Sequence, residues 1–339
     1  MPDATVLVVN AGSTSLKLHL VSPADDAEAL ASFRDVAPDR VAAVAHRVVH
    51  GGELREPARI TEDVLAAIED ASALAPLHNR PALAAIDEAV AALPAVPHVA
   101  VFDTGFHAMI PPAAATYAVP RRWREEWGVR RYGFHGLSVQ WAAERARARR
   151  LVVCHLGGGS SITAVLDGRS VDTTMGFSPL EGVPMTTRAG SVDPGVLLHL
   201  LREGLLGLAD LERELEHESG LAGLSEGGSG DIREASPLAL DVYVHRVAGA
   251  VGAAATALGG LDALVFTAGI GERSPETRAR IAERLRFLGV ELDPEANAAA
   301  RGDADISGAG AAVRTLVVAA REEIVAARAA RELLVAETE

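Results

Sequence analysis

Two stretches of the sequence, about half a chain apart, share a pattern: an apolar run, a turn of small polar residues and an alternating run. The first covers residues 6–21 and turns at Asn-Ala-Gly-Ser-Thr-Ser, and the second covers residues 151–166 and turns at Gly-Gly-Gly-Ser-Ser. Period-two alternation beside a short turn predicts a β-hairpin. Two such hairpins in a chain of 339 residues, which is long enough for two hydrophobic cores, predict two similar α/β halves.

The turn of the first hairpin has the composition of an anion-binding loop. Gly12 allows backbone N–H groups to approach a phosphate, and the hydroxyls of Ser13, Thr14 and Ser15 add donors. The Gly-x4-Gly-Lys-Ser/Thr spacing of a Walker loop is missing, however. An ordinary hairpin with a polar turn explains this stretch equally well when it is considered alone.

Two rare residue types lie in the same hairpin. Of the 32 lysines and arginines only Lys17 is a lysine, and Asn10 is one of three asparagines. A compact ammonium group beside a phosphate is a role for which the planar guanidinium of arginine is a poor substitute. A lysine retained at this one position therefore favours the phosphate-binding interpretation.

Composition and charge exclude several classes of function. Hydrophobic residues make up 49% and charged residues 23% of the chain, which is typical of a globular protein. The formal net charge of -14 argues against nucleic acid or an anionic membrane as the main partner. Cys154 is the single cysteine, which excludes an intrachain disulfide and a cysteine metal cluster. Because the sequence shows neither a basic leader nor an apolar run of about 18 residues, we expect a soluble, cytoplasmic protein.

Periodicity predicts the main helices. Residues 61–75 keep helical spacing after Thr61, a residue suited to an N-cap, and residues 238–258 predict a long, Ala-rich and mostly buried helix. Between residues 74 and 81 the prolines predict a turn, followed by a helix from Pro81 to Leu93.

Three more segments bear on function. Residues 173–195 are rich in turn formers and contain Arg188, which predicts a loop of the kind that carries function. A buried strand from Ala263 leads into a Gly269-x-Gly271 turn just before a helix, which is a usual nucleotide position, although a lone Gly-x-Gly motif is weak evidence. By itself, Glu322 at the start of the last helix indicates only a favourable, solvated first turn.

Eight motifs, taken in order, resemble those of the acetate and propionate kinase family, within the superfamily of sugar kinases, actin and heat-shock ATPases. The matches, which include these motifs, spread from Val6 to Arg328 and so cover nearly the whole chain. The motifs are Asn-Ala-Gly-Ser-Thr-Ser-Leu-Lys at 10–17, His-Arg-Val-Val-His-Gly-Gly at 46–52, Leu-Ala-Pro-Leu-His-Asn at 74–79, Phe-Asp-Thr-Gly-Phe-His at 102–107, Arg-Arg-Tyr-Gly-Phe-His-Gly at 130–136, His-Leu-Gly-Gly-Gly-Ser-Ser at 155–161, the loop 179–193 and Phe-Thr-Ala-Gly-Ile-Gly-Glu at 266–272. Each alone is modest evidence, but together they are highly specific.

The resemblance implies an α/β fold of two similar actin-like, ribonuclease H-like domains. Each would be a mixed β-sheet flanked by helices, with the active site in the cleft between the domains. The N-terminal domain would span residues 1–148, carry the acyl-substrate residues and be joined by the C-terminal helix 323–339. The C-terminal domain would span residues 149–322 and carry the nucleotide-binding residues.

The activity that the resemblance implies is a reversible, direct in-line transfer of the γ-phosphoryl group of ATP to acetate, which gives acetyl phosphate and ADP. The enzyme would depend on Mg²⁺, accept Mn²⁺ in its place and work as a homodimer. Propionate or butyrate as acceptor is the alternative within the family, because one methylene changes binding by only about 1–3 kcal/mol. A non-catalytic ATP-binding regulator is the alternative from another class.

The same resemblance gives roles to charged residues. Arg47 and Arg188 would hold the acyl carboxylate, Arg188 and His135 would stabilise the transferring phosphoryl group, and Asp103 would orient the attacking carboxylate. Without the motifs, structural ion pairs would be the favoured interpretation of Arg47 and Arg188. A core or capping role is the alternative for His135.

The remaining assignments also follow from the resemblance. Asn10 and Glu322 would hold Mg²⁺, and Lys17 would contact an ATP phosphate. The acyl group would meet a small apolar pocket of Val49, Leu77, Phe134 and Pro179. ATP would also be bound by the phosphate-loop residues Ser13 and Ser15 and by His155, Leu156, Gly157, Gly158, Gly159, Asp231, Ile232, Arg233, Gly269, Ile270, Gly271, Glu272 and Arg273.

The chain departs from the family pattern at three positions. Gly158 stands where many relatives carry asparagine, Thr186 where glycine is usual, and Arg321 where asparagine usually precedes the glutamate. The chain is also shorter than typical members, mainly in the connections between motifs. None of these departures removes a charge that the reaction needs.

Overall fold

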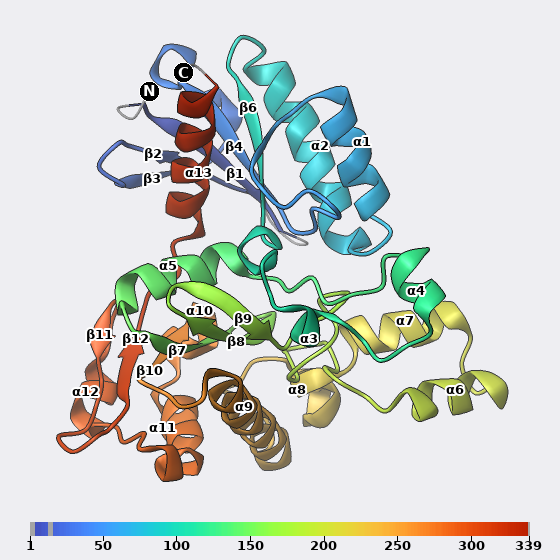
Figure 1. Cartoon of the computed structure of the whole chain (residues 1–339), viewed down its shortest axis with the longest axis vertical. Helices are drawn as coiled ribbons and strands as arrows, with labels where there is room; N and C mark the ends of the chain where they lie inside the picture. Colours follow the sequence, from blue (N-terminus) through green and yellow to red (C-terminus); the bar gives the residue numbers. More distant parts are fainter. Residues whose placement is uncertain (1–3, 13–15, 338–339) are drawn as a thin grey trace. The chain divides into compact units, whose positions relative to one another are not determined.

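The computed structural model describes residues 4–12 and 16–337, without the side chains of residues 76 and 77. The chain divides into two compact units (Figure 1). Residues 109–133 lie in the second unit, and the chain crosses into it again after Trp141, whereas the expected boundary was at residue 148. The ranges are Met1–Ala108, Phe134–Trp141 and Arg321–Glu339 for unit 1, and Met109–Gly133 and Ala142–Ala320 for unit 2.

Unit 1 is built on a sheet that has six strands in the described residues, in the order β3-β2-β1-β4-β6-β5. β1, β4 and β6 are parallel, whereas β2, β3 and β5 run antiparallel to the strands with which they pair. The bounds are β1 Val6–Ala11, β2 Leu16–Val21, β3 Ala27–Leu30, β4 Ala43–Val48, β5 Ala58–Arg59 and β6 His98–Phe102.

Unit 2 repeats this topology in the part of the chain that the structure describes. Its strand order, read from one edge, is β9-β8-β7-β10-β12-β11, with β7, β10 and β12 parallel and the outer strands antiparallel. Each unit thus contains one of the two hairpins, and the predicted fold of two similar α/β halves is confirmed. The bounds are β7 Arg150–Leu156, β8 Ser160–Leu166, β9 Arg169–Thr173, β10 Ala263–Thr267, β11 Ala304–Asp305 and β12 Arg314–Val317.

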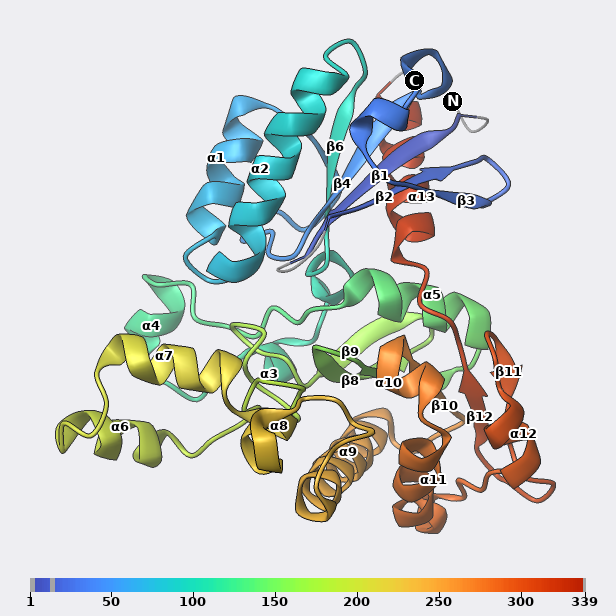
Figure 2. The same cartoon turned by 180° about the vertical axis from the view of Figure 1, so that it is seen from behind.

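Helices cover both faces of the unit 1 sheet. Val8 of β1 belongs to a buried cluster with Val325 of α13, whereas Val9, its neighbour on the opposite face, belongs to a cluster with Ala89 of α2. Figures 1 and 2 show α13 on one face of this sheet and α1 and α2 on the other. The helices are η1 Phe33–Asp35, η2 Pro38–Arg40, α1 Glu62–Ala71, α2 Pro76–Ala92, η3 Gly105–His107, α5 Gly136–Ala146 and α13 Glu322–Ala336, of which α5 continues into unit 2.

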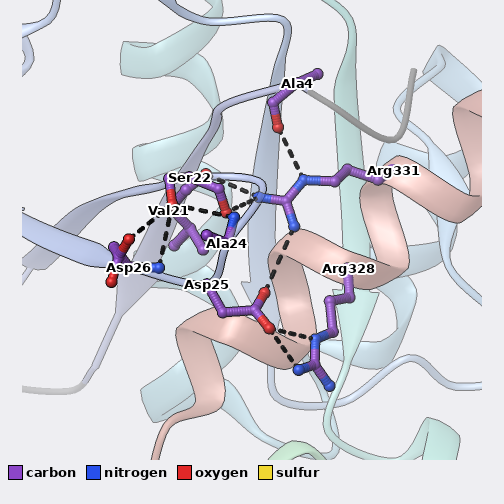
Figure 3. A network of polar contacts seen from close by, with 8 residues as sticks. All are labelled: Ala4, Val21, Ser22, Ala24, Asp25, Asp26, Arg328 and Arg331. Carbon is purple, nitrogen blue, oxygen red and sulfur yellow. Dashed lines mark hydrogen bonds and ion pairs between the residues drawn. The ribbon is translucent and has the colours of Figure 1, made fainter.

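Two arginines fix α13 to the strands of unit 1 (Figure 3). The Arg331 side chain is 8% exposed, and it donates three hydrogen bonds of 2.8 Å to the backbone carbonyls of Ala4, Val21 and Ser22. Asp25 accepts hydrogen bonds from Arg328, one of them at 3.1 Å, and lies 3.7 Å from Arg331. Asp25 has a left-handed φ of 65°, which costs a residue with a Cβ about 1–2 kcal/mol. The ion pairs therefore stabilise a strained turn.

The core of unit 2 lies between its sheet and α9. Tyr243 and Val247 of α9 are fully buried in a cluster with Val152 of β7. α9 confirms the predicted long helix, and among the described residues it is the one helix that could cross a membrane by length and composition alone. Ten of its residues are buried, so core packing explains its apolar character. The helices are α3 Pro112–Ala115, α4 Arg121–Glu125, α6 Pro194–Arg202, α7 Leu208–His217, α8 Gly220–Leu224, η4 Glu226–Gly228, α9 Pro237–Leu258, α10 Ala268–Arg273, α11 Pro275–Arg284, η5 Arg286–Leu288 and α12 Pro294–Ala299.

The turn predicted between residues 74 and 81 is wrong, because α2 already begins at Pro76. The Asn79 side chain fixes this first helical part: it bonds to the backbone N–H and carbonyl of His50, at 3.0 and 2.9 Å. Pro81 therefore lies inside the helix, where it removes one backbone donor. The N-cap predicted at Thr61 is confirmed, since its hydroxyl accepts a hydrogen bond from the Val64 N–H at 3.3 Å.

The predicted Gly269-x-Gly271 turn is also wrong, because these glycines belong to α10. The chain passes from β10 straight into this short helix at Ala268, whose φ of 66° supplies the sharp change of direction that a turn would otherwise make. Ser274 then caps α11 and accepts a hydrogen bond from the Thr277 N–H at 3.3 Å.

Candidate active site

The ends of the parallel strands of unit 1 bring polar side chains together. Asn10 on β1 is in register with Arg47 on β4, and Asp103 directly follows β6. Glu322, the first residue of α13, reaches the same place, where its Oε2 accepts a hydrogen bond from Asn10 Nδ2 at 3.4 Å. These four residues, from four separate elements, form what we call the unit 1 cluster. The structure thus brings together four residues that the sequence separates by up to 312 positions.

Arg47 is at the centre of the unit 1 cluster. Its Nε donates to Asp103 Oδ1 at 3.0 Å, its Nη2 donates to Asp103 Oδ2, and its Nη1 donates to Asn10 Oδ1 at 3.0 Å. Its Nε also lies 3.4 Å from Glu322 Oε2. The side chains of Arg47 and Asp103 are only 14% and 1% exposed. Such a buried pair is costly to break, because removal of one partner leaves the other charge uncompensated.

The pKa values of this pair reflect burial first and the neighbouring charges second. Burial raises the pKa of the Asp103 carboxyl to about 6, and the Glu322 carboxylate adds to the increase, although Arg47 acts in the opposite direction. Burial lowers the pKa of Arg47, but Asp103 and Glu322 outweigh it and hold the pKa above its usual value. At pH 7 Asp103 is therefore ionised and Arg47 is charged.

The backbone of His135 and Gly136 forms hydrogen bonds with Asp103. The N–H of His135 donates to the Asp103 carboxylate, and the N–H of Gly136 donates to the Asp103 carbonyl at 2.9 Å. A Cβ at position 136 would lie 2.1 Å from that carbonyl oxygen, so only glycine fits. His135 itself has a left-handed φ of 60°, and non-glycine residues in such conformations concentrate at functional sites.

The other residues predicted for unit 1 divide into three groups. Val49 and Phe134 are buried, and the Phe134 ring meets the His50 ring edge-on with 5.5 Å between centroids. Lys17 is exposed and lies opposite Asn10 in the register of β1 and β2. The predicted Ser13, Ser15 and the side chain of Leu77 lie outside the described residues.

Two glycine-rich segments meet at one edge of the unit 2 sheet. His155 near the end of β7 is in register with Thr267 at the end of β10, and the chain then continues into residues 157–159 and into α10. A Cβ at Gly157 would lie 3.6 Å from the backbone nitrogen of Gly269, so the two segments are neighbours. In open α/β sheets, ligands bind beyond the carboxyl ends of parallel strands, which is where both segments lie.

Thr186 connects this edge to the loop that contains residues 231–233, which are predicted to bind ATP. Its Oγ1 donates to the Gly158 carbonyl at 3.1 Å, and a Cβ at Gly230 would lie 2.9 Å from its carbonyl oxygen. In that loop the N–H and Nε of Arg233 both donate to Asp231 Oδ1 at 2.9 Å, and the side-chain hydrogen bond is the main reason that the pKa of Asp231 is lowered to about 2. Unit 2 therefore brings its three predicted nucleotide-binding segments side by side.

Arg188 lies two residues beyond Thr186 in a loop without regular structure. Residues 174–193, all of them described, contain no helix or strand, which confirms the predicted loop. Arg188 Nη1 donates to the carbonyl of the buried Pro179 at 3.3 Å, and the Arg188 carbonyl accepts from the Met185 N–H at 3.0 Å. Burial lowers the pKa of Arg188, and Glu216 partly offsets this effect.

Sequence reasoning assigned no role to two residues that the structure links to these segments. Thr186 bridges the Gly158 turn and the Gly230 loop, and Asn79 fixes the backbone of His50. A signal existed for Asn79, because asparagine occurs only three times in the chain. Thr186 stood out only as a departure from the family pattern, and its partners could not be predicted because they lie 28 and 44 positions away.

The unit 1 cluster offers oxygen ligands for a metal. Among the described residues, no group of three or more His, Cys, Asp or Glu side chains could hold a metal ion. Glu322 and Asn10 nevertheless present a carboxylate and an amide oxygen, which are hard ligands. Mg²⁺ is usually held by one or two carboxylates together with water and substrate phosphates. The residues present fit that mode of binding and do not fit a metal site made by protein ligands alone.

The sequence matches the model of the Acetokinase family over residues 31–328. An acetate kinase of Gloeobacter violaceus is 48% identical over 311 residues, which cover 86% of this chain and 76% of the relative. An acetate kinase of Leifsonia xyli subsp. xyli is 43% identical, with 98% of this chain and all of the relative covered.

Solved structures give the same result. A propionate kinase from Francisella tularensis has a TM-score of 0.88 and 32% identity, with 96% of this chain and 98% of that chain covered. The acetate kinase of Porphyromonas gingivalis has a TM-score of 0.85 and 32% identity, with 98% and 100% covered. The family model matches most of the sequence, and these structures match nearly the whole fold. The chain therefore belongs to the acetokinase family.

Proposed function

We propose that the protein is a Mg²⁺-dependent acetate kinase, which transfers the γ-phosphoryl group of ATP reversibly and directly to acetate and so forms acetyl phosphate and ADP. The observation that supports this most strongly is the charged Arg47 in the unit 1 cluster, whose side chain is only 14% exposed. Acetate is already ionised at neutral pH, so the reaction needs a cation that holds a carboxylate rather than a general base.

The Arg47 guanidinium has N–H groups that can bind a substrate carboxylate. Its guanidinium carries five N–H groups, and in the described residues its hydrogen bonds to Asp103 and Asn10 use three of them. The two that remain match the two oxygens of an acetate ion. Asp103 fixes the plane of the guanidinium from the other side, so in this proposal it is the residue that positions Arg47.

The unit 2 segments would bind the nucleotide. The exposed turn at Gly158 and the start of α10 present backbone close to the edge of the sheet, where phosphate can approach. Arg188 would stabilise the charge of the transferring phosphoryl group, as cations do in other phosphoryl transfers. Mg²⁺, held by Glu322 and Asn10 with the phosphates, would neutralise part of the charge on the phosphate oxygens.

Trapping of the acyl phosphate with hydroxylamine tests this proposal. Purified protein with ATP, Mg²⁺ and acetate should give acetyl hydroxamate, and omission of ATP, omission of acetate or removal of the metal with EDTA should abolish it. A folded preparation that gives no hydroxamate with acetate, propionate or butyrate would overturn the proposal, and the non-catalytic regulator would then be favoured. We also propose that the enzyme acts in the cytoplasm, where its ATP substrate is available.

Propionate is the second candidate acceptor, because a propionate kinase is among the structures most similar to this chain. The values of kcat/KM for acetate, propionate and butyrate decide between them. We expect the highest value with acetate. A tenfold higher value with propionate or butyrate would replace acetate as the substrate and leave the reaction type unchanged.

A further inference from the structure

A tyrosine hydroxyl lies in the apolar core of unit 2. Tyr243 of α9 is 0% exposed and belongs to the cluster that contains Val152 and Phe266. Its hydroxyl lies 3.2 Å from the hydroxyl of Ser160, the first residue of β8, which is also 0% exposed. Burial of a polar group costs free energy unless the group is hydrogen-bonded, and phenylalanine would fill the same space without that cost. The hydroxyl therefore indicates a role beyond core packing.

The Ser160 hydroxyl connects Tyr243 to the turn between β7 and β8. It accepts a hydrogen bond from the Gly157 N–H at 3.3 Å and donates one to the Gly157 carbonyl at 3.4 Å. Because a hydroxyl has a single hydrogen, Tyr243 is the donor in its bond to Ser160. Burial raises the pKa of the Tyr243 phenol, so the phenol keeps the proton that it donates. A chain of hydrogen bonds thus leads from α9 to Gly157.

The protein holds all three carbonyls of this turn. The Gly157 carbonyl accepts from Ser160, and the Gly158 carbonyl accepts from Thr186 Oγ1 at 3.1 Å. The Gly159 carbonyl accepts from the Gly157 N–H at 3.0 Å. By contrast, none of the described residues accepts a hydrogen bond from the N–H of Gly158 or Gly159. The turn therefore offers two neighbouring backbone donors, and no competing acceptor, to an anion such as phosphate.

These two donors depend on other residues for their position. Residues 157–159 are all glycine, the residue type with the greatest conformational freedom to lose. The turn therefore has no side chain of its own to pack against the protein and fix it. Donors that are already in place bind a charge more tightly, because they need not be ordered when it arrives. The hydrogen bonds from Ser160 and Thr186 supply this order.

We infer that Tyr243 is a positioning residue for phosphate binding: it acts through Ser160 on the turn 157–159 and so places the N–H groups of Gly158 and Gly159 for a nucleotide phosphate. The inference rests on the proposed function for the identity of the anion, a phosphate of ATP or ADP. Tyr243 itself lies in the core and touches no substrate. Its hydroxyl thus gives α9 a part in nucleotide binding.

Tyr243→Phe tests this inference, because it removes one oxygen atom and keeps the ring in the core. We expect the dissociation constant for ADP, measured by titration calorimetry with Mg²⁺ present, to rise about fivefold, the effect of one lost hydrogen bond. KM for ATP should rise by a similar factor. KM for acetate and kcat should change little, because the turn would contact only the nucleotide. Unchanged ADP affinity in Tyr243→Phe would overturn the inference.

Thr163→Val is the matched control, because it also removes a buried hydrogen bond between two hydroxyls. Thr163 Oγ1 lies 2.8 Å from Thr173 Oγ1, and Thr163 is on the same strand as Ser160, three positions further along. This variant should lose stability in urea denaturation and bind ADP as tightly as the wild type. An equal loss of ADP affinity in Thr163→Val and Tyr243→Phe would show a general effect of a weakened sheet and would refute a specific role of Tyr243.

A double-mutant cycle tests whether the effect passes through Ser160. Ser160→Ala should weaken ADP binding at least as much as Tyr243→Phe, because it also removes the bonds to Gly157. Adding Tyr243→Phe to Ser160→Ala should cause no further loss. Losses of affinity that multiply in the double variant would contradict a common path.

Hydrogen exchange gives a measurement that does not depend on turnover. The amide of Gly157 should exchange faster in Tyr243→Phe than in the wild type and in Thr163→Val, and equal exchange in all three would contradict the link to the turn. Failure of the kinase proposal is distinguishable, because the hydroxamate assay would then be negative while Tyr243→Phe still bound ADP more weakly than the wild type. A folded wild type that binds no ADP would overturn the inference.

Discussion

Thr186 Oγ1 donates a hydrogen bond to the carbonyl oxygen of Gly158 at 3.1 Å, and the Thr186 N–H approaches the same oxygen at 3.4 Å. The resemblance drawn from the motifs implies that these are two of three positions at which the sequence departs from the family pattern. A Cβ at Gly158 would meet no atom within 4 Å, so a side chain such as asparagine would fit there. The two positions are thus in contact, and the threonine hydroxyl stabilises a turn that has no side chain of its own at Gly158.

Removal of that hydroxyl should weaken ATP binding. Thr186→Val keeps the shape of the side chain and loses one hydrogen bond, which is worth about 1 kcal/mol, so we expect KM for ATP to rise roughly fivefold with kcat little changed. Thr187→Val is the control, because the Thr187 hydroxyl bonds instead to the Glu216 carbonyl at 2.8 Å. Steady-state kinetics with varied ATP measure both. An equal rise in KM for the two variants would contradict a specific effect of the hydrogen bond from Thr186 to Gly158.

The ion pair between Arg47 and Asp103 should behave as a unit in stability measurements. Arg47→Met or Asp103→Leu alone leaves a buried charge without its partner, so we expect each to lower the free energy of unfolding by about 3–5 kcal/mol. The double variant should lose much less than the sum of the two, because no uncompensated charge remains. Urea denaturation measures this, and all three variants should lack kinase activity. Additive losses would show that the pair is not coupled.

Arg188→Ala should affect the chemical step more than binding. Loss of a cation that stabilises the transferring phosphoryl group is expected to lower kcat by about 10³-fold or more. Arg131→Ala is a suitable comparison, because Arg131 lies in unit 2 but forms an ion pair with Glu181 at 3.0 Å and has no predicted contact with substrate. Turnover of Arg188→Ala within tenfold of the wild type would remove Arg188 from the mechanism.

A buried histidine pair should make stability depend on pH. His46 Nε2 and His98 Nδ1 are 2.9 Å apart, and His98 Nε2 lies 3.1 Å from the Leu93 carbonyl, which can only accept. His98 Nε2 therefore carries the proton, and His46 donates to His98. Burial, with His98 adding to it, lowers the pKa of His46 to about 3 from the 6.5 of an exposed histidine. The native state thus contains neutral His46, whereas the unfolded chain takes up a proton below pH 6.5.

The direction of the pH dependence follows from this lowered pKa. The stability that neutral His46 contributes is fully present above about pH 6.5 and is lost as the pH falls toward 3. Between pH 7 and pH 5 the His46 contribution is a loss of roughly 2 kcal/mol. Asp103 acts oppositely, since its raised pKa makes protonation near pH 6 favour the native state. His46→Leu separates the two effects, because it removes the histidine and keeps Asp103. Denaturant unfolding at several pH values should show that the variant loses less free energy of unfolding between pH 7 and pH 5 than the wild type. If the free energy of unfolding depended on pH in the same way in both proteins, His46 would not be the cause.

Local patterns sufficed to predict the fold class but not the topology of the sheets. The hairpins at residues 6–21 and 151–166 each combine an apolar run, a short polar turn and an alternating run, so their form could be predicted from neighbouring residues. The order of β4 and β6 beside β1 depends on contacts between distant strands that are apolar on both faces. Such strands carry no alternation that would reveal their partners.

The same limit applies to the candidate site. Motifs identified Arg47 and Asp103 as important, yet their pairing depends on the register of β4 and β6, which no local pattern encodes. The predicted turn around Pro81 failed for a related reason: the bonds of Asn79 to His50, 29 positions away, outweigh the local preference of proline. Where a tertiary contact decides a local conformation, propensity alone predicts the wrong element.

The position of α13 has a consequence for the biosynthesis of the protein. Residues 325–334 supply part of the buried cluster that covers Val6 and Val8, and these two valines leave the ribosome more than 300 residues earlier. Unit 2 is complete once residue 320 has been made, so it can fold while unit 1 still waits for its last helix. We therefore expect the reverse of the usual N-terminal-first order of folding during synthesis. Nascent chains that stop before residue 322 should expose one apolar face of the first sheet and be strong substrates for chaperones.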